Sequence, residues 1–282
     1  MNPRSFTTTL SLFFILFVFT LCIAPLIGSS NINLARAFSS SINLSNNTDA
    51  NILFQVRLPR ILLGALAGAA LSVAGAIFQA LLRNDLAAPF TLGVSSGAAL
   101  GAVIAIALNL NFYMLGIPLV SIFSFLGSLG SIMLVFSLVR TRHGELPTGV
   151  LLLAGVTVNF FFAAMVMFIH YLADFGQSFR IIRWLMGGLD ITNYKTVLTI
   201  FPVLFLGFFI LMIISRDLNL ISTGAYSASS RGVDVSKVQK LGFITASLIT
   251  GIVVANCGPI GFVGLIVPHT VRLLVGPDLR IL

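Results

Sequence analysis

The sequence predicts an all-α fold, a polytopic transmembrane helical bundle, and three observations lead to this class. Of the 282 residues, 57% are hydrophobic and only 9% are charged, whereas a soluble domain carries roughly 25% charged residues. The mean hydropathy is +1.06. The apolar residues come in runs of about 20, the helix length that crosses ~30 Å of hydrocarbon. We therefore expect one transmembrane domain over residues 1–282 rather than two soluble domains.

The first apolar run covers about residues 10–27 and follows Arg4, as a signal peptide would. It has no clear small-x-small cleavage site and is long enough to span the membrane, so we predict a retained first helix. A stretch rich in Asn and Ser follows at about 29–51. It is too hydrophilic for lipid and is predicted to be a loop on the far side of the membrane.

Six further spans are predicted, which gives about seven in all. They cover residues 58–82, 92–110, 117–139, 150–172, 196–215 and 241–267. Connectors with charged residues, Gly or Pro are predicted at 83–85, 140–147, 173–194 and 216–240. The last connector is the longest polar segment between spans.

The net charge of +8 comes from Lys and Arg scattered between the apolar runs, with no basic cluster or RNA-binding motif. Nucleic acid is therefore not an expected partner. Placed on alternate sides of the predicted spans, the 16 Lys and Arg divide eight against eight, so the positive-inside rule gives no orientation. If the amino terminus is cytoplasmic, an acidic docking partner would account for the arginines on the far side.

The acidic residues fall in connectors or at the edges of spans. They are Asp49, Asp85, Glu145, Asp174, Asp190, Asp217, Asp234 and Asp278. An ionised carboxylate at mid-membrane costs at least ~2.5 kcal/mol and is kept mainly where it carries protons or sodium ions. The pattern therefore disfavours an ion-coupled transporter, and it favours transport driven by a partner, or a passive path.

No catalytic, metal or cofactor site is predicted, so the chain is not expected to be an enzyme. It has no G-x-x-x-x-G-K-[ST] motif for nucleotide phosphates, and His143, His170 and His269 show no ligand spacing such as H-E-x-x-H. Cys22 and Cys257 lie inside apolar runs, which supports neither a disulfide framework nor a metal knuckle. Any use of ATP is therefore expected in another polypeptide.

Glycines recur at every fourth position at Gly93, Gly97 and Gly101. Residues 93–97 also match G-x-S-x-G, but that nucleophile motif needs a strand-to-helix turn with Asp and His partners in order. We interpret the glycines as a smooth face on which helix backbones approach closely in the membrane. The same interpretation is given to two further sets: Gly64 and Gly68, then Gly258, Gly261 and Gly264.

Three blocks of sequence carry more information than packing alone. The first includes RLPR at 57–60, GAIFQ at 75–79, RNDLAAP at 83–89 and LGVSSGA at 92–98. The second is LNL at 218–220 followed by Gly224, Ala228 and Gly232. The third is GPIGFVGLIVPH at 258–269, with Arg272 and Gly276 after it.

Together these blocks resemble the FecCD-type permeases, a family that includes vitamin B12 and ferric-siderophore importers. The resemblance covers nearly all of the chain from about residue 57, and the third block matches almost residue for residue. Three positions depart from the family pattern. Asp85 stands where the family usually has proline, Ala225 stands at an acidic position and Arg231 stands at a leucine position.

The resemblance implies the fold of a type II ABC importer permease in the bacterial inner membrane, with the amino terminus inside. It implies a homodimer with the path at the subunit interface, a separate ABC ATPase, and a periplasmic or lipid-anchored substrate-binding protein. The expected substrate is an iron-siderophore-type chelate, with haem and cobalamin left open. Family members have about ten spans, so three carboxy-terminal helices are expected to be missing. A truncated, non-transporting remnant or one half of a split permease is the alternative.

The resemblance also implies site residues. Gly224, Ala228 and Gly232 are expected in the segment that couples to the ATPase. Arg57 and Arg60 are expected to face outward and dock the binding protein. The family hallmark comprises Gly258, Phe262, Gly264, Pro268, His269 and Arg272. Within it, Pro268 is expected to end a helix because it has no N–H, and His269 is expected to form hydrogen bonds at that helix end.

Overall fold

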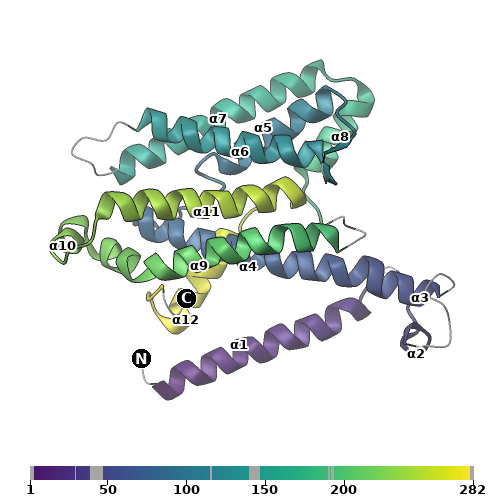
Figure 1. Ribbon diagram of the computed structural model, residues 1–282, viewed down its shortest axis with the longest axis horizontal. Coiled ribbons are helices and arrows are strands. Elements are labelled where there is room, and N and C mark those ends of the chain that lie inside the picture. Colours follow the sequence, from purple (N-terminus) through teal and green to yellow (C-terminus); the bar gives the residue numbers. More distant parts are fainter. Residues whose placement is uncertain are drawn as a thin grey trace.

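The computed structural model describes residues 3–28, 30–38, 47–114, 116–139, 147–189, 191 and 194–279. Most of the predicted connector at 140–147, with His143 and Glu145, lies outside these residues, and so does Asp190. Figure 1 shows long helices that run nearly side by side, with the first helix set apart along one edge. The predicted all-α transmembrane bundle is confirmed.

Among the described residues, six helices are long and apolar enough to cross a membrane. They are α1 (Pro3–Ile23), α4 (Leu58–Leu82), α6 (Leu119–Leu138), α7 (Thr148–Leu172), α9 (Lys195–Thr223) and α11 (Val235–Cys257). Shorter elements are α2 (Leu34–Ala37), α3 (Thr48–Asn51), α5 (Val94–Ala107), β1 (Tyr113–Met114), β2 (Ile117–Pro118), α8 (Phe175–Leu185), α10 (Ala225–Ser229) and α12 (Val263–Val275). A 3-10 turn (Ala24–Leu26) follows α1, and a π-helical stretch (Ile52–Arg57) leads into α4.

Three predicted spans differ from the observed helices. α5 has 14 residues, about 21 Å of helix, which is too short to cross ~30 Å of hydrocarbon by itself. The span predicted at 241–267 divides into α11, a non-helical break at 258–262, and α12. The span predicted to end at 215 continues as α9 to Thr223, so the polar connector after it is shorter than predicted.

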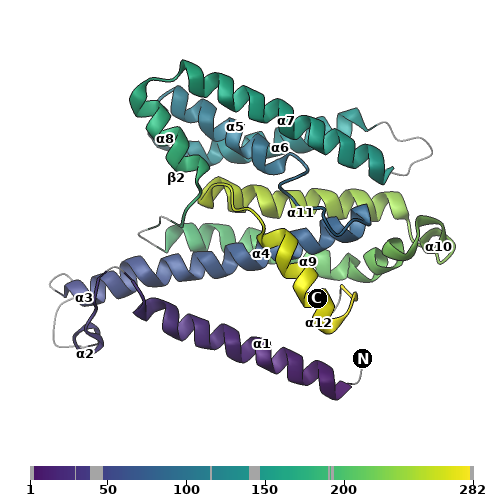
Figure 2. The ribbon, with the colours of Figure 1, turned by 180° about the vertical axis from the view of Figure 1, so that it is seen from behind.

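Helix α11 forms the centre of the bundle. In Figures 1 and 2 it lies between a layer that contains α5, α6 and α7 and a layer that contains α4 and α9. In its apolar window 72% of the residues are buried, against 6% for α1. The ring of Phe243 on α11 packs edge-on against Phe78 of α4 and Phe136 of α6, at centroid distances of 5.4 and 5.0 Å. These aromatic contacts join the two layers.

Helices α5 and α6 pack backbone to backbone through glycine. A β-carbon added at Gly101 would stand 2.0 Å from the carbonyl oxygen of Phe123, and one at Gly97 would stand 2.5 Å from that of Gly127. The packing interpretation of Gly97 and Gly101 is confirmed. Gly93 lies just before α5 at φ 83°, and its carbonyl accepts a 2.7 Å hydrogen bond from the Ser131 hydroxyl of α6.

The other predicted glycine faces are only partly packed. Gly264 lies against Gly75 of α4, whereas Gly68 and Gly261 have open space beside them. Gly258 has a φ of 68° and caps α11, so it belongs to the break before α12. Gly258 and Gly261 lie in the non-helical break, and Gly264 lies in α12. The three glycines therefore do not form one helix face.

We expect Gly101→Ala to lower the apparent unfolding temperature of the detergent-solubilised chain, because the new methyl group would overlap the Phe123 carbonyl. Overpacking of this kind costs about 1–3 kcal/mol. Gly130→Ala on α6 is the matched control, since no heavy atom lies within 4 Å of its added β-carbon. Equal unfolding temperatures for the two variants would contradict the packing assigned to Gly101.

Candidate functional site

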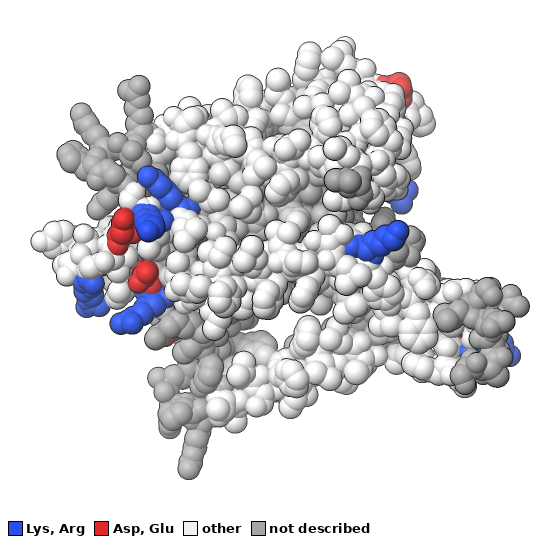
Figure 3. All heavy atoms as spheres, viewed as in Figure 1, with Lys and Arg blue, Asp and Glu red and all other residues white. Residues whose placement is uncertain are grey.

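Charged side chains gather at the two ends of the long helices, and the middle of the visible face carries none (Figure 3). One end, which we call the α10 end, carries the start of α1, the turn after α4, α10 and the last turn of α12. The opposite α8 end carries α3, α8 and the β1–β2 hairpin. A belt without charges between two charged ends is the surface that a bilayer requires.

At the α10 end, the three predicted coupling residues shape the segment after α9. Gly224 and Gly232 have φ values of 148° and 85°, which favour glycine. Ala228 is fully buried, and its N–H donates to the Gly224 carbonyl at 2.9 Å. Tyr226, which is 89% exposed, is the aromatic side chain among those that this segment exposes. The sequence pattern found the segment but missed Tyr226, which lies between the spaced small residues.

Pro268 lies inside α12, so the prediction that it ends a helix is wrong. Gly276, at φ 102°, caps that helix instead. Because Pro268 has no N–H, the Gly264 carbonyl lacks the donor that a helix supplies four residues on. The oxygen of this carbonyl lies against α4, only 1.8 Å from where a β-carbon on Gly75 would stand. Helices α4 and α12 therefore touch through their backbones.

The remaining hallmark residues lie around this contact. Phe262 precedes α12 with a φ of 65°, and its side chain is 73% exposed. A positive φ is unusual for a bulky residue and marks the start of the helix as a special conformation. His269 is exposed in the interior of α12, and no hydrogen bond of its ring is found within the described part of the chain. The prediction of a hydrogen-bonding residue at a helix end is therefore wrong for His269.

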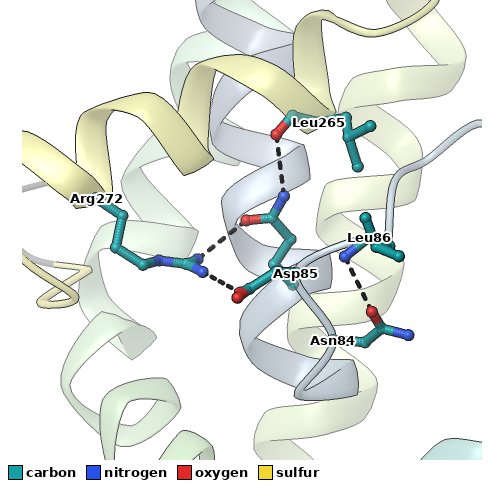
Figure 4. Close-up of polar contacts among 6 residues, drawn as sticks. Asn84, Asp85, Leu86, Leu265 and Arg272 are labelled. Atoms are coloured by element: carbon teal, nitrogen blue, oxygen red, sulfur yellow. Dashed lines mark hydrogen bonds and ion pairs between the residues drawn. The ribbon is translucent and has the colours of Figure 1, made fainter.

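Arg272 joins α12 to α4 through a polar network (Figure 4). Its Nη1 forms an ion pair with Asp85 in the turn after α4, and its Nη2 donates to Gln79 Oε1 at 3.0 Å. Gln79 is only 2% exposed, and its Nε2 donates to the Leu265 carbonyl at 3.3 Å. Asp85, the residue that departs from the family proline, thus has a specific partner.

At the α8 end, Arg57 has a structural role that the sequence did not predict. It is only 9% exposed, and its Nη1 donates to the Pro25 carbonyl at 2.7 Å. Its Nη2 donates to the Ser30 carbonyl. The guanidinium therefore ties the start of α4 to the 3-10 turn and the chain that follow α1. The prediction that Arg57 faces outward for docking is wrong.

Arg60 lies one turn further along α4 and is exposed, and its Nε donates to the Leu189 carbonyl at 3.0 Å. The sequence predicted only a connector at 173–194 and missed helix α8 there. A capping box between Asp174 and Gln177 begins α8, and the Gln177 amide also donates to the last carbonyl of α5, at Ala107. The Asp-x-x-Gln spacing was a readable signal for this helix.

This arrangement defines a class of protein: a membrane bundle with charged residues at both ends of its long helices and a shaped, exposed segment at one of them. The chain matches the FecCD transport family over residues 15–282, so it belongs to that family. It is a permease of the ABC importer kind, and the resemblance predicted from the three sequence blocks is confirmed.

Relatives with assigned names support this membership. The chain is 40% identical over 248 residues to an uncharacterized ABC transporter permease of Bacillus subtilis. The matched region covers 87% of this chain and 69% of that protein. It is 40% identical to the cobalamin import system permease BtuC of Halobacterium salinarum, covering 82% of this chain and 61% of that protein. It is 37% identical to the hemin transport system permease HmuU of Yersinia pestis, covering 94% and 79%. The chain thus spans 61–79% of the length of these relatives.

A solved structure of a metal-chelate type ABC transporter in an inward-facing conformation has the same fold. It superposes with a TM-score of 0.81 at 30% sequence identity, and the match covers 100% of this chain and 84% of that chain.

We expect Arg272→Met to lower the unfolding temperature more than Asp85→Asn does. Asp85 is 63% exposed at its side chain, and exposed ion pairs contribute about 0–1 kcal/mol. Loss of Arg272 removes a donor from the buried Gln79 oxygen, and an unsatisfied buried polar group costs about 1–3 kcal/mol. The double variant Gln79→Leu/Arg272→Met should recover part of the loss in a thermal unfolding assay. Equal effects of the two single variants would contradict this ranking.

Proposed function

We propose that this chain is the membrane-spanning permease subunit of an importer for an iron-siderophore-type chelate in the bacterial inner membrane. The observation that carries the proposal is the exposed α10 segment, framed by two glycines, at the end of a FecCD-family bundle. Relatives named as a ferric citrate permease and as probable iron chelatin permeases support an iron chelate as substrate. The metal-chelate transporter of similar fold supports the same substrate class.

The energy for transport comes from a separate ABC ATPase that docks on the α10 segment. The chain has no phosphate-binding loop of its own. The described acidic residues also lie outside the central belt, so a proton or sodium gradient has no carboxylate there to act on. Closure of the ATPase would displace the α10 segment and tilt the helices between inward-open and outward-open states.

The working unit is a homodimer with the substrate path between its two copies. Helix α7 supports this arrangement, because it exposes a run of large apolar and aromatic side chains on one flank of the bundle. They include Phe160, Phe161, Met167, Phe168 and Tyr171. A second copy would cover part of this flank. A path lined by neutral side chains would leave selectivity largely to the binding protein that delivers the chelate.

We expect Tyr226→Ala to reduce co-purification of the ATPase with the detergent-solubilised chain. Tyr226 is 89% exposed at the α10 end, and an exposed tyrosine is a common anchor in protein interfaces, where its truncation costs about 2 kcal/mol or more. Tyr113→Ala in the β1–β2 hairpin is the matched control, because Tyr113 is 71% exposed at the opposite end. If both variants retain the ATPase, Tyr226 is not an anchor of the interface with the ATPase.

We expect Arg60→Glu to reduce uptake of a radiolabelled ferric chelate into proteoliposomes that contain the permease, its ATPase and the chelate-loaded binding protein. The reversed charge would repel carboxylates on the binding protein and slow its docking. The affinity of the binding protein for the permease is measured in the same preparation. Arg231 is exposed in the α10 segment, so Arg231→Glu is the control and should leave this affinity unchanged. Unchanged affinity of Arg60→Glu would contradict the docking role, and uptake of haem or cobalamin in place of the ferric chelate would overturn the substrate.

A further inference from the structure

Asn219 joins the last turns of α9 to the chain that follows α12. Its Nδ2 donates to Asp278 Oδ1 at 2.6 Å, and its Oδ1 accepts from the Leu279 backbone N–H at 2.9 Å. One amide group therefore uses both its donor and its acceptor on two successive residues. Asn219 lies only one turn and a half before Gly224, where the α10 segment begins.

The segment held by Asn219 is the direct continuation of α12. Gly276 ends α12 at φ 102°, and the chain then returns toward α9. The Leu279 side chain helps to line an apolar pocket of about 230 Å³ between α4, α9 and α12, together with Ile77, Leu211 and Pro268 among others. The Asn219 hydrogen bonds thus fix the end of α12 against α9 at the point where an apolar side chain also packs.

A second tie connects the same region of α9 to α4. Arg83 ends α4 with a φ of 48°, and its Nε donates to the carbonyl of Ile221 at 3.0 Å. Ile221 is fully buried. With the Arg272–Gln79 bond between α12 and α4, hydrogen bonds link each of α4, α9 and α12 to the other two at the α10 end.

The opposite end of α12 is held differently. Between α11 and α12 the chain is not helical at 258–262, and both Gly258 and Phe262 have positive φ values. The Gly75–Gly264 backbone contact lies just inside the helix. The non-helical break packs against the end of α8, since a β-carbon on Gly258 would stand 2.7 Å from the Trp184 carbonyl oxygen. Helix α12 therefore has a close crossing point near its start and a polar attachment to α9 beyond its end.

We propose that Asn219 is the positioning residue that couples the α10 segment to α12, so that movement of this segment tilts α12. The proposal rests on the proposed permease function, and it adds the route by which that movement enters the membrane. A purely structural clasp would use the same hydrogen bonds but would affect stability and coupling together. The two roles therefore predict different measurements.

The first experiment measures substrate transported per ATP hydrolysed in proteoliposomes that contain the permease, its ATPase and the loaded binding protein. We expect Asn219→Ala to lower this ratio about tenfold, since two hydrogen bonds to one amide group are lost. Co-purification of the ATPase should remain at the level of the unaltered chain. Ser222→Ala is the matched control, because the Ser222 hydroxyl donates to the Asn219 backbone carbonyl and, among the described residues, to no group outside α9.

Substitutions of Asp278 test the partner in the same assay. Asp278→Asn keeps an oxygen that accepts from Asn219 and should retain coupling, whereas Asp278→Leu should lower it as Asn219→Ala does. An unchanged ratio in Asn219→Ala would overturn the proposal. The proposal would also be overturned if every variant, Asp278→Asn included, lost coupling in proportion to its loss of thermal stability. Asn219 would then have a structural role alone.

A second measurement needs no partner protein and separates failure of this inference from failure of the proposed function. Spin labels at Ser229→Cys and Leu273→Cys, in a Cys22→Ser background, report the distance between α10 and α12; both labelled positions are exposed. We expect a narrow distance distribution that broadens with Asn219→Ala and not with Ser222→Ala. Equal distance distributions in Asn219→Ala and the unaltered chain would overturn the coupling role of Asn219. Failure of the unaltered chain to bind any ATPase would overturn the permease function alone.

Discussion

The crossing of α12 over α4 depends on a contact between two backbones. The Gly264 carbonyl, released by Pro268 from the usual helical hydrogen bond, fits against Gly75 because that residue has no side chain. In a membrane the hydrophobic effect does not press helices together, so close contacts between small residues carry much of their association. The same contact fixes where α12 starts along α4, and Arg272, about two turns further on, then lies beside Gln79 and the turn after α4.

The cations at both ends of the bundle are used in the same physical way. Arg57 at the α8 end and Arg272 and Arg83 at the α10 end each donate to a carbonyl near a helix end or to a buried amide of another element. A guanidinium offers several N–H donors in a fixed plane, so one side chain can join two elements. The net positive charge is therefore partly a structural requirement of helix ends.

The sequence predicted the long helices well, because an apolar run that is long enough to span leaves few alternatives to a helix. α4 was predicted at its observed bounds. The break between α11 and α12 was not predicted, since residues 258–262 are apolar and a hydropathy pattern does not register positive φ values at Gly258 and Phe262. Burial of Arg57 was missed for a related reason: a charged residue at a span edge is usually exposed, and its carbonyl partners near Pro25 and Ser30 are remote in sequence.

The departure at Asp85 has a meaning that sequence comparison alone does not supply. Its ion pair with Arg272 is largely exposed at the Asp85 side, and such pairs add about 0–1 kcal/mol, whereas the bond from Arg272 to Gln79 is made to a buried amide. The turn after α4 is therefore attached to α12 more weakly than α4 itself is. Proline at position 85 would lack the charge to make even this weak attachment.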